Sequence, residues 1–83
     1  MNTKEEIYQK IVSIFEELFE IEAQKITLDA RLYQDLDIDS IDAVDLVVEL
    51  KKMTGKKIQP EEFKTVRTVQ DVVDQIYKLV NQG

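Results

Sequence analysis

The stretch DLDIDSIDAVDL occupies residues 35–46 and sets where a central helix of the chain begins. Asp39 and Ser40 are both favourable N-cap residues, because their side-chain oxygens accept hydrogen bonds from the free N–H groups of a first helical turn. Apolar residues then recur at helical spacing up to about Met53, and Gly55 supplies a common left-handed helix end. We therefore predict a helix that starts at Ser40 or the residue before it and ends near Gly55.

Two further helices are predicted, one on either side of this one. Thr3 and Glu6 fit a capping box, and the apolar period that follows predicts a first helix to about Phe19. Thr68, with Asp71 three positions later, is the predicted cap of a last helix. The apolar stripe of the first helix is Ile7, Ile11, Ile14, Phe15 and Leu18, and that of the last is Val69, Val72, Val73, Ile76 and Val80.

The remaining segments predict a loop and one short helix. Residues 20–38 show no sustained period, which predicts a long ordered loop between the first two main helices. Pro60 is expected to open a short helix over Glu61–Lys64, where its missing N–H has no cost. The predicted fold class is all-α, a small bundle of three main helices plus one short helix, in a single domain over residues 1–83. The expected loop anchors are Ile21, Ile26, Leu28, Leu32 and Leu36.

Composition excludes several classes of function. The chain of 83 residues has a formal net charge of −6, so we expect no nucleic-acid partner and instead partners with basic surfaces. The absence of cysteine removes disulfides, thiol catalysis and zinc–thiolate sites. No apolar run is long enough to span a membrane, and no signal-peptide pattern follows Met1. We expect a cytoplasmic, monomeric protein without membrane insertion.

Ser40 has the surroundings of a residue that is modified rather than of a catalytic nucleophile. A catalytic serine needs an activating base such as His or Lys, and this chain has no histidine. Between Ala30 and Leu50 the only cationic residue is Arg31, which does not lose its proton. We therefore predict no catalytic residues and interpret Ser40 as a hydroxyl on which another protein acts.

The helix after Ser40 has two apolar faces where a surface helix needs only one. At 100° per residue, one face is formed by Ala43, Leu46, Val47 and Leu50, and it is expected to face the core. A second face begins beside Ser40 and has carboxylates along its edge, which is typical of a partner-docking surface. Packing of this face against the short helix after Pro60 is the alternative. The side chains of Asp42 and Asp45 are expected to be exposed. The predicted docking residues are Asp39, Ile41, Asp42, Val44, Asp45, Val48 and Glu49.

Three other interpretations of the acidic stretch have to be weighed. An N-cap serine among acidic residues is common for structural reasons alone. Asp35, Asp37 and Asp39 occupy the first, third and fifth positions of an EF-hand loop, but Ser40 and Leu46 replace its glycine and its bidentate glutamate. A metal site is therefore not predicted, although a divalent-cation-responsive helical interaction module remains the alternative function. Glycoside cleavage by paired carboxylates does not suit so small a domain.

The stretch from Asp39 to Leu46, DSIDAVDL, resembles the Asp-Ser-Leu-Asp-x-Val-Glu-Leu signature of acyl carrier proteins, with conservative changes at Ile41 and Asp45. The resemblance extends over nearly the whole chain, because the order of helices and the TVQD start of the last helix also match. It implies that a phosphopantetheinyl transferase attaches 4′-phosphopantetheine to Ser40.

The resemblance further implies a carrier that is not itself an enzyme. Its cofactor would be covalent 4′-phosphopantetheine, whose thiol carries acyl intermediates as thioesters for fatty-acid or polyketide-type biosynthesis. The implied partners are the transferase and the acyl-chain synthases, reductases and acyltransferases. Their Arg and Lys side chains would meet the carboxylates of the docking residues, while the apolar docking residues would form the centre of the contact.

The chain departs from the family pattern at two places. Asp37 stands where the family often has glycine, so the turn before Ser40 is a point of possible difference. Four lysines follow the predicted docking helix where many fatty-acid carriers are acidic. A helix C-terminus favours cations, and an altered choice of partners is the other interpretation. These residues are Lys51, Lys52, Lys56 and Lys57.

Overall fold

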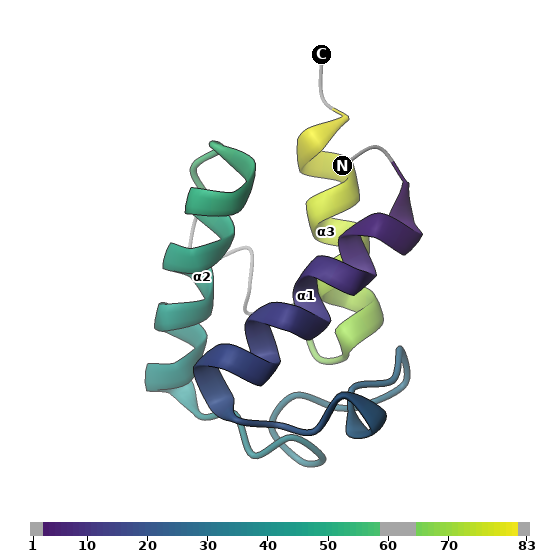
Figure 1. Cartoon of the computed structure of the whole chain (residues 1–83). Coiled ribbons are helices and arrows are strands. Elements are labelled where there is room, and N and C mark those ends of the chain that lie inside the picture. The colour runs from purple at the N-terminus through teal and green to yellow at the C-terminus, as the bar shows by residue number, and fades with distance from the viewer. Residues whose placement is uncertain (1–2, 59–64, 82–83) are drawn as a thin grey trace.

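The structure, a computed structural model, describes residues 3–58 and 65–81. Within these ranges it contains α1 (Lys4–Phe19), the 3-10 turn η1 (Ala23–Lys25), α2 (Ser40–Thr54) and α3 (Val69–Val80) (Figure 1). The all-α prediction and the order of the three main helices are confirmed. The short helix predicted over residues 61–64 lies outside the described residues.

The helix ends follow the capping residues that the sequence supplies. Thr3 accepts a hydrogen bond from the Glu6 N–H at 3.2 Å, which starts α1. Thr68 and Asp71 form a full capping box at the start of α3, each side chain accepting from the other's backbone N–H. Gly55 ends α2 with φ of 70°, the left-handed conformation that glycine adopts most easily.

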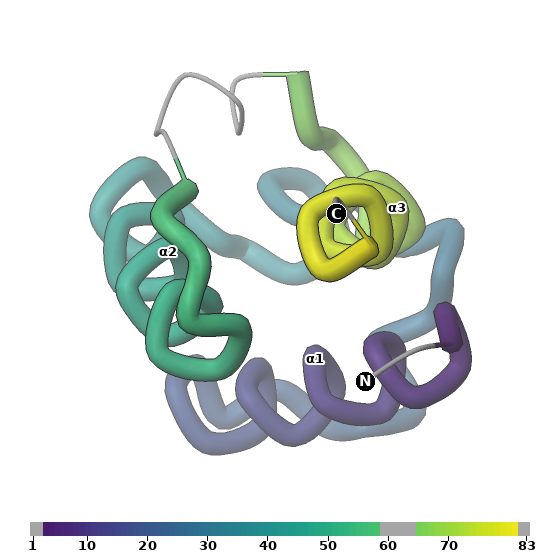
Figure 2. The backbone as a smooth tube through the Cα atoms, turned by 90° about the horizontal axis from the view of Figure 1, so that it is seen from above, coloured from purple at the N-terminus to yellow at the C-terminus, as the bar shows by residue number. Residues whose placement is uncertain are grey.

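Helix α1 is the element against which both other helices pack. Figure 2 shows α1 lying across the molecule, with α2 and α3 next to each other on the same side of it, one near each of its ends. The stripes of α1 and α3 are buried as predicted at most positions, but Leu18 is exposed and both Ile14 and Val80 are only partly buried. No described residue with a polar or charged side chain is buried in this core, so apolar contact holds the helices together.

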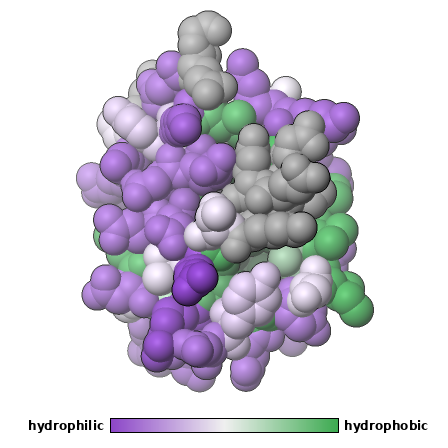
Figure 3. Space-filling model, turned by 180° about the vertical axis from the view of Figure 1, so that it is seen from behind, coloured by the Kyte–Doolittle hydropathy of each residue, from purple (hydrophilic) through white to green (hydrophobic). Residues whose placement is uncertain are grey.

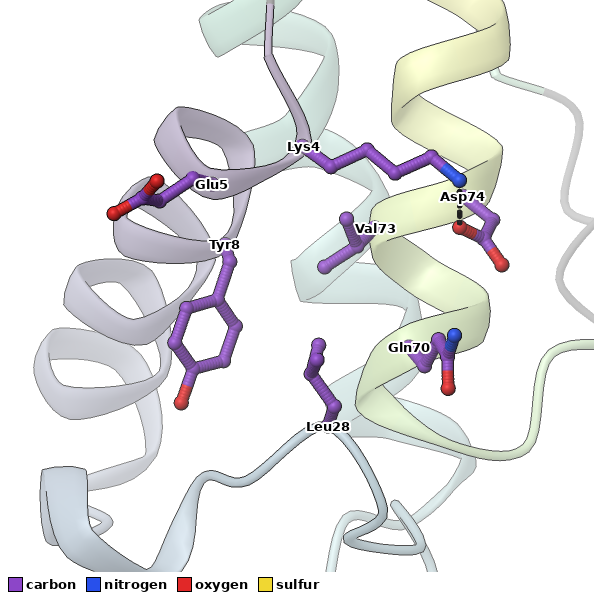
Figure 4. A pocket seen from close by; sticks show the side chains of 7 residues that line it. All are labelled: Lys4, Glu5, Tyr8, Leu28, Gln70, Val73 and Asp74. Atoms are coloured by element: carbon purple, nitrogen blue, oxygen red, sulfur yellow. Dashed lines mark ion pairs between the residues drawn. The ribbon is translucent and has the colours of Figure 1, made fainter.

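The long loop before α2 is ordered by apolar anchors, as predicted, with one exception. Ile26, Leu32 and Leu36 are buried, and Ile21 is partly buried. Leu28 is 42% exposed, so the prediction that it anchors the loop in the core is wrong. Its side chain instead lines a hollow between α1 and α3 (Figure 4).

Polar contacts around the same hollow join α1 to the loop and to α3. Figure 4 shows Lys4 of α1 reaching to Asp74 of α3, with Nζ 3.0 Å from Oδ1. The Tyr8 hydroxyl donates a hydrogen bond to the Ile26 carbonyl oxygen. Because Ile26 belongs to the loop, this bond fixes the loop's first half against α1.

The second half of the loop is held by backbone hydrogen bonds to the start of α3. The Leu32 N–H donates to the Arg67 carbonyl at 2.8 Å, and the Val69 N–H donates to the Ala30 carbonyl at 3.0 Å. These bonds form an antiparallel bridge between Arg31 and Thr68. The loop is therefore attached to α1 and to the start of α3 before it reaches α2.

Candidate functional site

The site lies at the head of α2, where Asp39 and Asp42 cap the helix reciprocally. Asp39 Oδ1 accepts a hydrogen bond from the Asp42 N–H at 2.9 Å, and Asp42 Oδ2 accepts one from the Asp39 N–H at 3.3 Å. Asp39 is thus the N-cap, and Ser40 is the first helical residue. The predicted helix start is confirmed.

The capping box leaves Ser40 exposed in the first turn of α2. The N-terminal end of the helix, where Ser40 lies, carries partial positive charge. Its hydroxyl makes no hydrogen bond to any residue within 3–58 and 65–81. No side chain in those ranges accepts a hydrogen bond from it, so the hydroxyl is accessible but is not activated by any of these residues. Such a group can accept a transferred group only when a second protein supplies the base.

Arg31, the cation nearest in sequence, is already engaged by Asp35. Asp35 Oδ2 accepts from the Arg31 backbone N–H at 2.8 Å and lies 3.4 Å from Nε. The backbone hydrogen bond is the main cause that lowers the pKa of the Asp35 carboxyl; slight desolvation opposes it, and the guanidinium charge adds to it. Arg31 therefore stabilises a carboxylate and does not activate Ser40.

Ile38 anchors the turn before Ser40 to the core. Ile38 is buried, and its N–H donates to the Leu32 carbonyl at 2.9 Å. Asp37, just before it, has φ of 55°, in the left-handed region that favours glycine. The aspartate at this position therefore adopts a conformation that a glycine would adopt more easily. The anchoring role of Ile38 was not predicted, although its apolar side chain between two aspartates was a signal for it.

Helix α2 presents the two apolar faces that its spacing predicted. Leu46 and Leu50 are buried, and Ala43 and Val47 are partly buried. On the other face the side chains stay open to solvent, and Figure 3 shows apolar atoms along the edge of the molecule formed by α2. The exposed fractions are 74% for Ile41, 60% for Val44 and 47% for Val48. An apolar surface of this kind, beside the exposed hydroxyl, suits transient contact with a partner.

The acidic residues around this surface differ in how freely they project. Asp45 is exposed. Asp42 is only partly exposed, so the prediction that its side chain is exposed is wrong, and it belongs to the capping box. Glu49 is partly buried, with Oε1 3.6 Å from Lys52 Nζ. Asp45 is therefore the rim carboxylate best placed to meet a partner without disturbing the helix.

The described residues offer no support for the divalent-cation interpretation. Across residues 3–58 and 65–81, no group of three or more acidic side chains is arranged to hold a metal ion. Asp35 and Asp39, at two of the EF-hand-like positions, have oxygens that accept hydrogen bonds from backbone N–H groups of Arg31 and Asp42.

The four lysines at the end of α2 and in the loop after it are exposed. Lys51 and Lys52 lie in the last turn of α2, where the helix dipole favours cations, and Lys52 also contacts Glu49. Lys56 and Lys57 follow Gly55 in the loop. The dipole accounts for the first two lysines only.

None of the helices in the described part of the chain is long and apolar enough to cross a membrane.

Comparison with known proteins agrees with this geometry. The family model described as a phosphopantetheine attachment site matches residues 9–76. Acyl carrier protein 2 of Ralstonia nicotianae is 51% identical over 78 residues, which cover 94% of this chain and 96% of that protein. The acyl carrier protein of Rhodococcus erythropolis is 38% identical over 82 residues, or 99% of this chain and 90% of that protein. The meromycolate extension acyl carrier protein of Mycobacterium leprae is 43% identical over 81 residues, 98% of this chain and 70% of that protein.

The chain belongs to the acyl carrier protein family. Proteins of this family are carriers rather than enzymes, and they bear acyl groups on covalently attached 4′-phosphopantetheine. The family role brings this chain into contact with biosynthetic enzymes, which carry out the chemistry on its cargo.

The two faces of α2 predict opposite responses to truncation. Leu46→Ala should lower the free energy of unfolding by about 2–5 kcal/mol, because it leaves a cavity in the core. Val44→Ala, on the exposed face, should change it by no more than about 0.5 kcal/mol. Urea unfolding followed by circular dichroism measures both variants. Equal losses would contradict the assignment of the faces.

The left-handed Asp37 predicts an unusual tolerance of glycine. Asp37→Gly should keep the free energy of unfolding within about 0.5 kcal/mol of the wild type, because relief of backbone strain offsets the added entropy of the unfolded chain. Asp29→Gly, at a residue without positive φ, should lose about 0.4–1 kcal/mol. Thermal and urea unfolding compare the two variants, and the same loss in both would contradict the strain at Asp37.

Proposed function

We propose that Ser40 is the residue that carries 4′-phosphopantetheine in this chain. The observation that carries the proposal is an exposed hydroxyl at the first position of α2, outside the hydrogen bonds of the capping box and hydrogen-bonded to no described side chain. The absence of cysteine fits the same role, because the thiol that carries the acyl group then comes from the cofactor.

The local electrostatics suit a phosphodiester without holding it strongly. The first-turn N–H groups and the dipole of α2 favour an anion by about 0.3–1 kcal/mol at an exposed position. Asp39 and Asp42 oppose this through like-charge repulsion. The attached arm is therefore expected to project from the helix rather than to lie fixed against it, which suits a group that must enter several enzymes.

The exposed face of α2 is the proposed docking surface, and it consists of the seven residues around Ser40 already named. Ile41, Val44 and Val48 would form the centre, with Asp45 and Glu49 on the rim. Asp39 and Asp42 contribute charge from within the capping box. The proposed partners are a phosphopantetheinyl transferase and acyl-chain synthases, reductases and acyltransferases with basic docking surfaces. Acidic steering speeds their encounter, and a small contact keeps residence short.

The proposed setting is that of a monomeric cytoplasmic carrier, with residues 1–83 as a single domain. The cargo would be an acyl intermediate of fatty-acid or polyketide-type synthesis. Support comes from the net charge of −6, from the absence of membrane-spanning helices among the described residues, and from the match of the family model over residues 9–76.

Replacement of the attachment residue provides the direct test of this proposal. Ser13 and Ser40 are the only serines of the chain, so each is a matched control for the other. With a phosphopantetheinyl transferase and coenzyme A, the wild type and Ser13→Ala should gain one phosphopantetheine mass, whereas Ser40→Ala should gain none. Intact-mass spectrometry measures the gain. Modification of Ser40→Ala would overturn the proposal.

Charge reversal at the rim should slow modification without unfolding the protein. Asp45→Lys is expected to reduce the rate of phosphopantetheine transfer about tenfold at low salt, because it removes steering toward a basic enzyme. Its free energy of unfolding should stay within about 0.5 kcal/mol of the wild type. Glu5→Lys makes the same charge change at the start of α1, away from the head of α2 (Figure 1). Equal rates for the two variants would contradict the docking surface.

A further inference from the structure

A second candidate site lies outside the exposed face of α2, in a pocket lined by both arginines of the chain. Arg31 and Arg67 are the only arginines in the sequence, and they line one open pocket of about 360 Å³. Tyr33, Gln34 and Val66 complete its lining.

Backbone pairing holds the two arginines together. The antiparallel bridge joins Arg31 to Thr68, and the Leu32 N–H bonds the Arg67 carbonyl at 2.8 Å. These contacts use main-chain atoms only. The pocket is thus preorganised, while the guanidinium groups stay on the surface.

The carboxylates near the pocket do not occupy all the N–H donors of its two guanidinium groups. Asp71 accepts hydrogen bonds from the backbone N–H groups of Arg67 and Thr68. Asp35 pairs with Arg31 through Nε alone among that guanidinium's nitrogens. The guanidinium of Arg67 forms no ion pair with any residue in 3–58 or 65–81. Its donors, and the terminal nitrogens of Arg31, are available to an incoming anion.

Building on the proposed attachment at Ser40, we infer that this pocket binds the free carboxylate of a dicarboxylic acyl group carried on the arm. Arginine recognises a carboxylate through paired N–H donors, and the 51% exposed Tyr33 and the buried Val66 offer apolar contact to its carbon chain. An acyl group without a terminal carboxylate gains nothing from the arginines. The pocket therefore distinguishes acidic cargo from neutral cargo.

The arm's attachment point lies close enough for this contact. The hydrogen bond from the Ile38 N–H to the Leu32 carbonyl brings Ile38 next to the residue that precedes Tyr33. Ser40 is two residues further, at most about 7 Å along the chain. The arm consists of a phosphate, a pantoyl unit, β-alanine and cysteamine, so its thiol reaches well beyond this span. The phosphate is bonded directly to the serine and stays at the helix, which leaves the pocket to the cargo.

Tethering explains why so open a pocket is sufficient. A ligand on a short flexible tether has an effective concentration in the millimolar range, so a weak contact is populated without a deep cavity. The same openness lets salt screen the contact and lets an enzyme withdraw the cargo.

The test compares two cargoes of similar size. A phosphopantetheinyl transferase loads the ¹⁵N-labelled protein from malonyl-coenzyme A or from butyryl-coenzyme A, and intact-mass spectrometry confirms each load. Malonyl, with its carboxylate, should shift the NMR signals of the Arg67 Nε–H and the amides of residues 31–34 relative to butyryl. The difference should shrink as salt is raised from about 0.05 to about 0.5 M, because the shorter Debye length screens the contact between the carboxylate and the arginines.

Variants separate the pocket from general charge effects. Arg67→Gln removes the guanidinium but keeps the backbone bridge, and it should abolish the malonyl-specific shifts. Lys78→Gln removes one positive charge from α3 and should leave them intact. Identical spectra for the malonyl and butyryl forms would overturn the inference while leaving attachment at Ser40 established. Absence of any added mass would instead overturn the attachment, and the inference with it.

Discussion

The backbone hydrogen bonds that join residues 30–32 to residues 67–69 constrain the rest of the structure. Without them the second half of the loop of residues 20–39 would be held to the helices only by its apolar anchors. With them, its second half is attached to the start of α3, and the Ile38 N–H then ties the final turn back to Leu32. The head of α2 is consequently delivered to a defined place on the surface by main-chain geometry.

A division of labour within α2 follows from this placement. Leu46 and Leu50 are buried and hold the helix to the bundle, whereas Ile41 and Val44 remain exposed beside Ser40. The reciprocal caps of Asp39 and Asp42 satisfy backbone N–H groups at the helix start, and in the proposed docking their charge would face partners. A carrier needs this separation, because a surface that changes partners repeatedly must not contribute to the core that keeps the protein folded.

Local features of the sequence predicted most of the fold and the centre of the site. The caps at Thr3, Asp39 and Thr68 are short-range patterns, and the two faces of α2 follow from 100° spacing alone. The path of the loop was harder, because apolar residues without a period do not reveal which of them reach the core. Leu28 was wrongly assigned for this reason, and Ile38 was missed. The pocket shared by Arg31 and Arg67 depends on contacts between distant segments, which no local pattern contains.

In the proposed function, this polypeptide supplies one exposed hydroxyl at a helix start, and the reactive sulfur is added to it. The most direct measurement is site localisation by tandem mass spectrometry on the wild-type protein after transfer from coenzyme A. We expect the added mass on the fragment that contains Ser40 and no added mass on the fragment that contains Ser13. Added mass on any fragment other than the one with Ser40 would contradict this proposal.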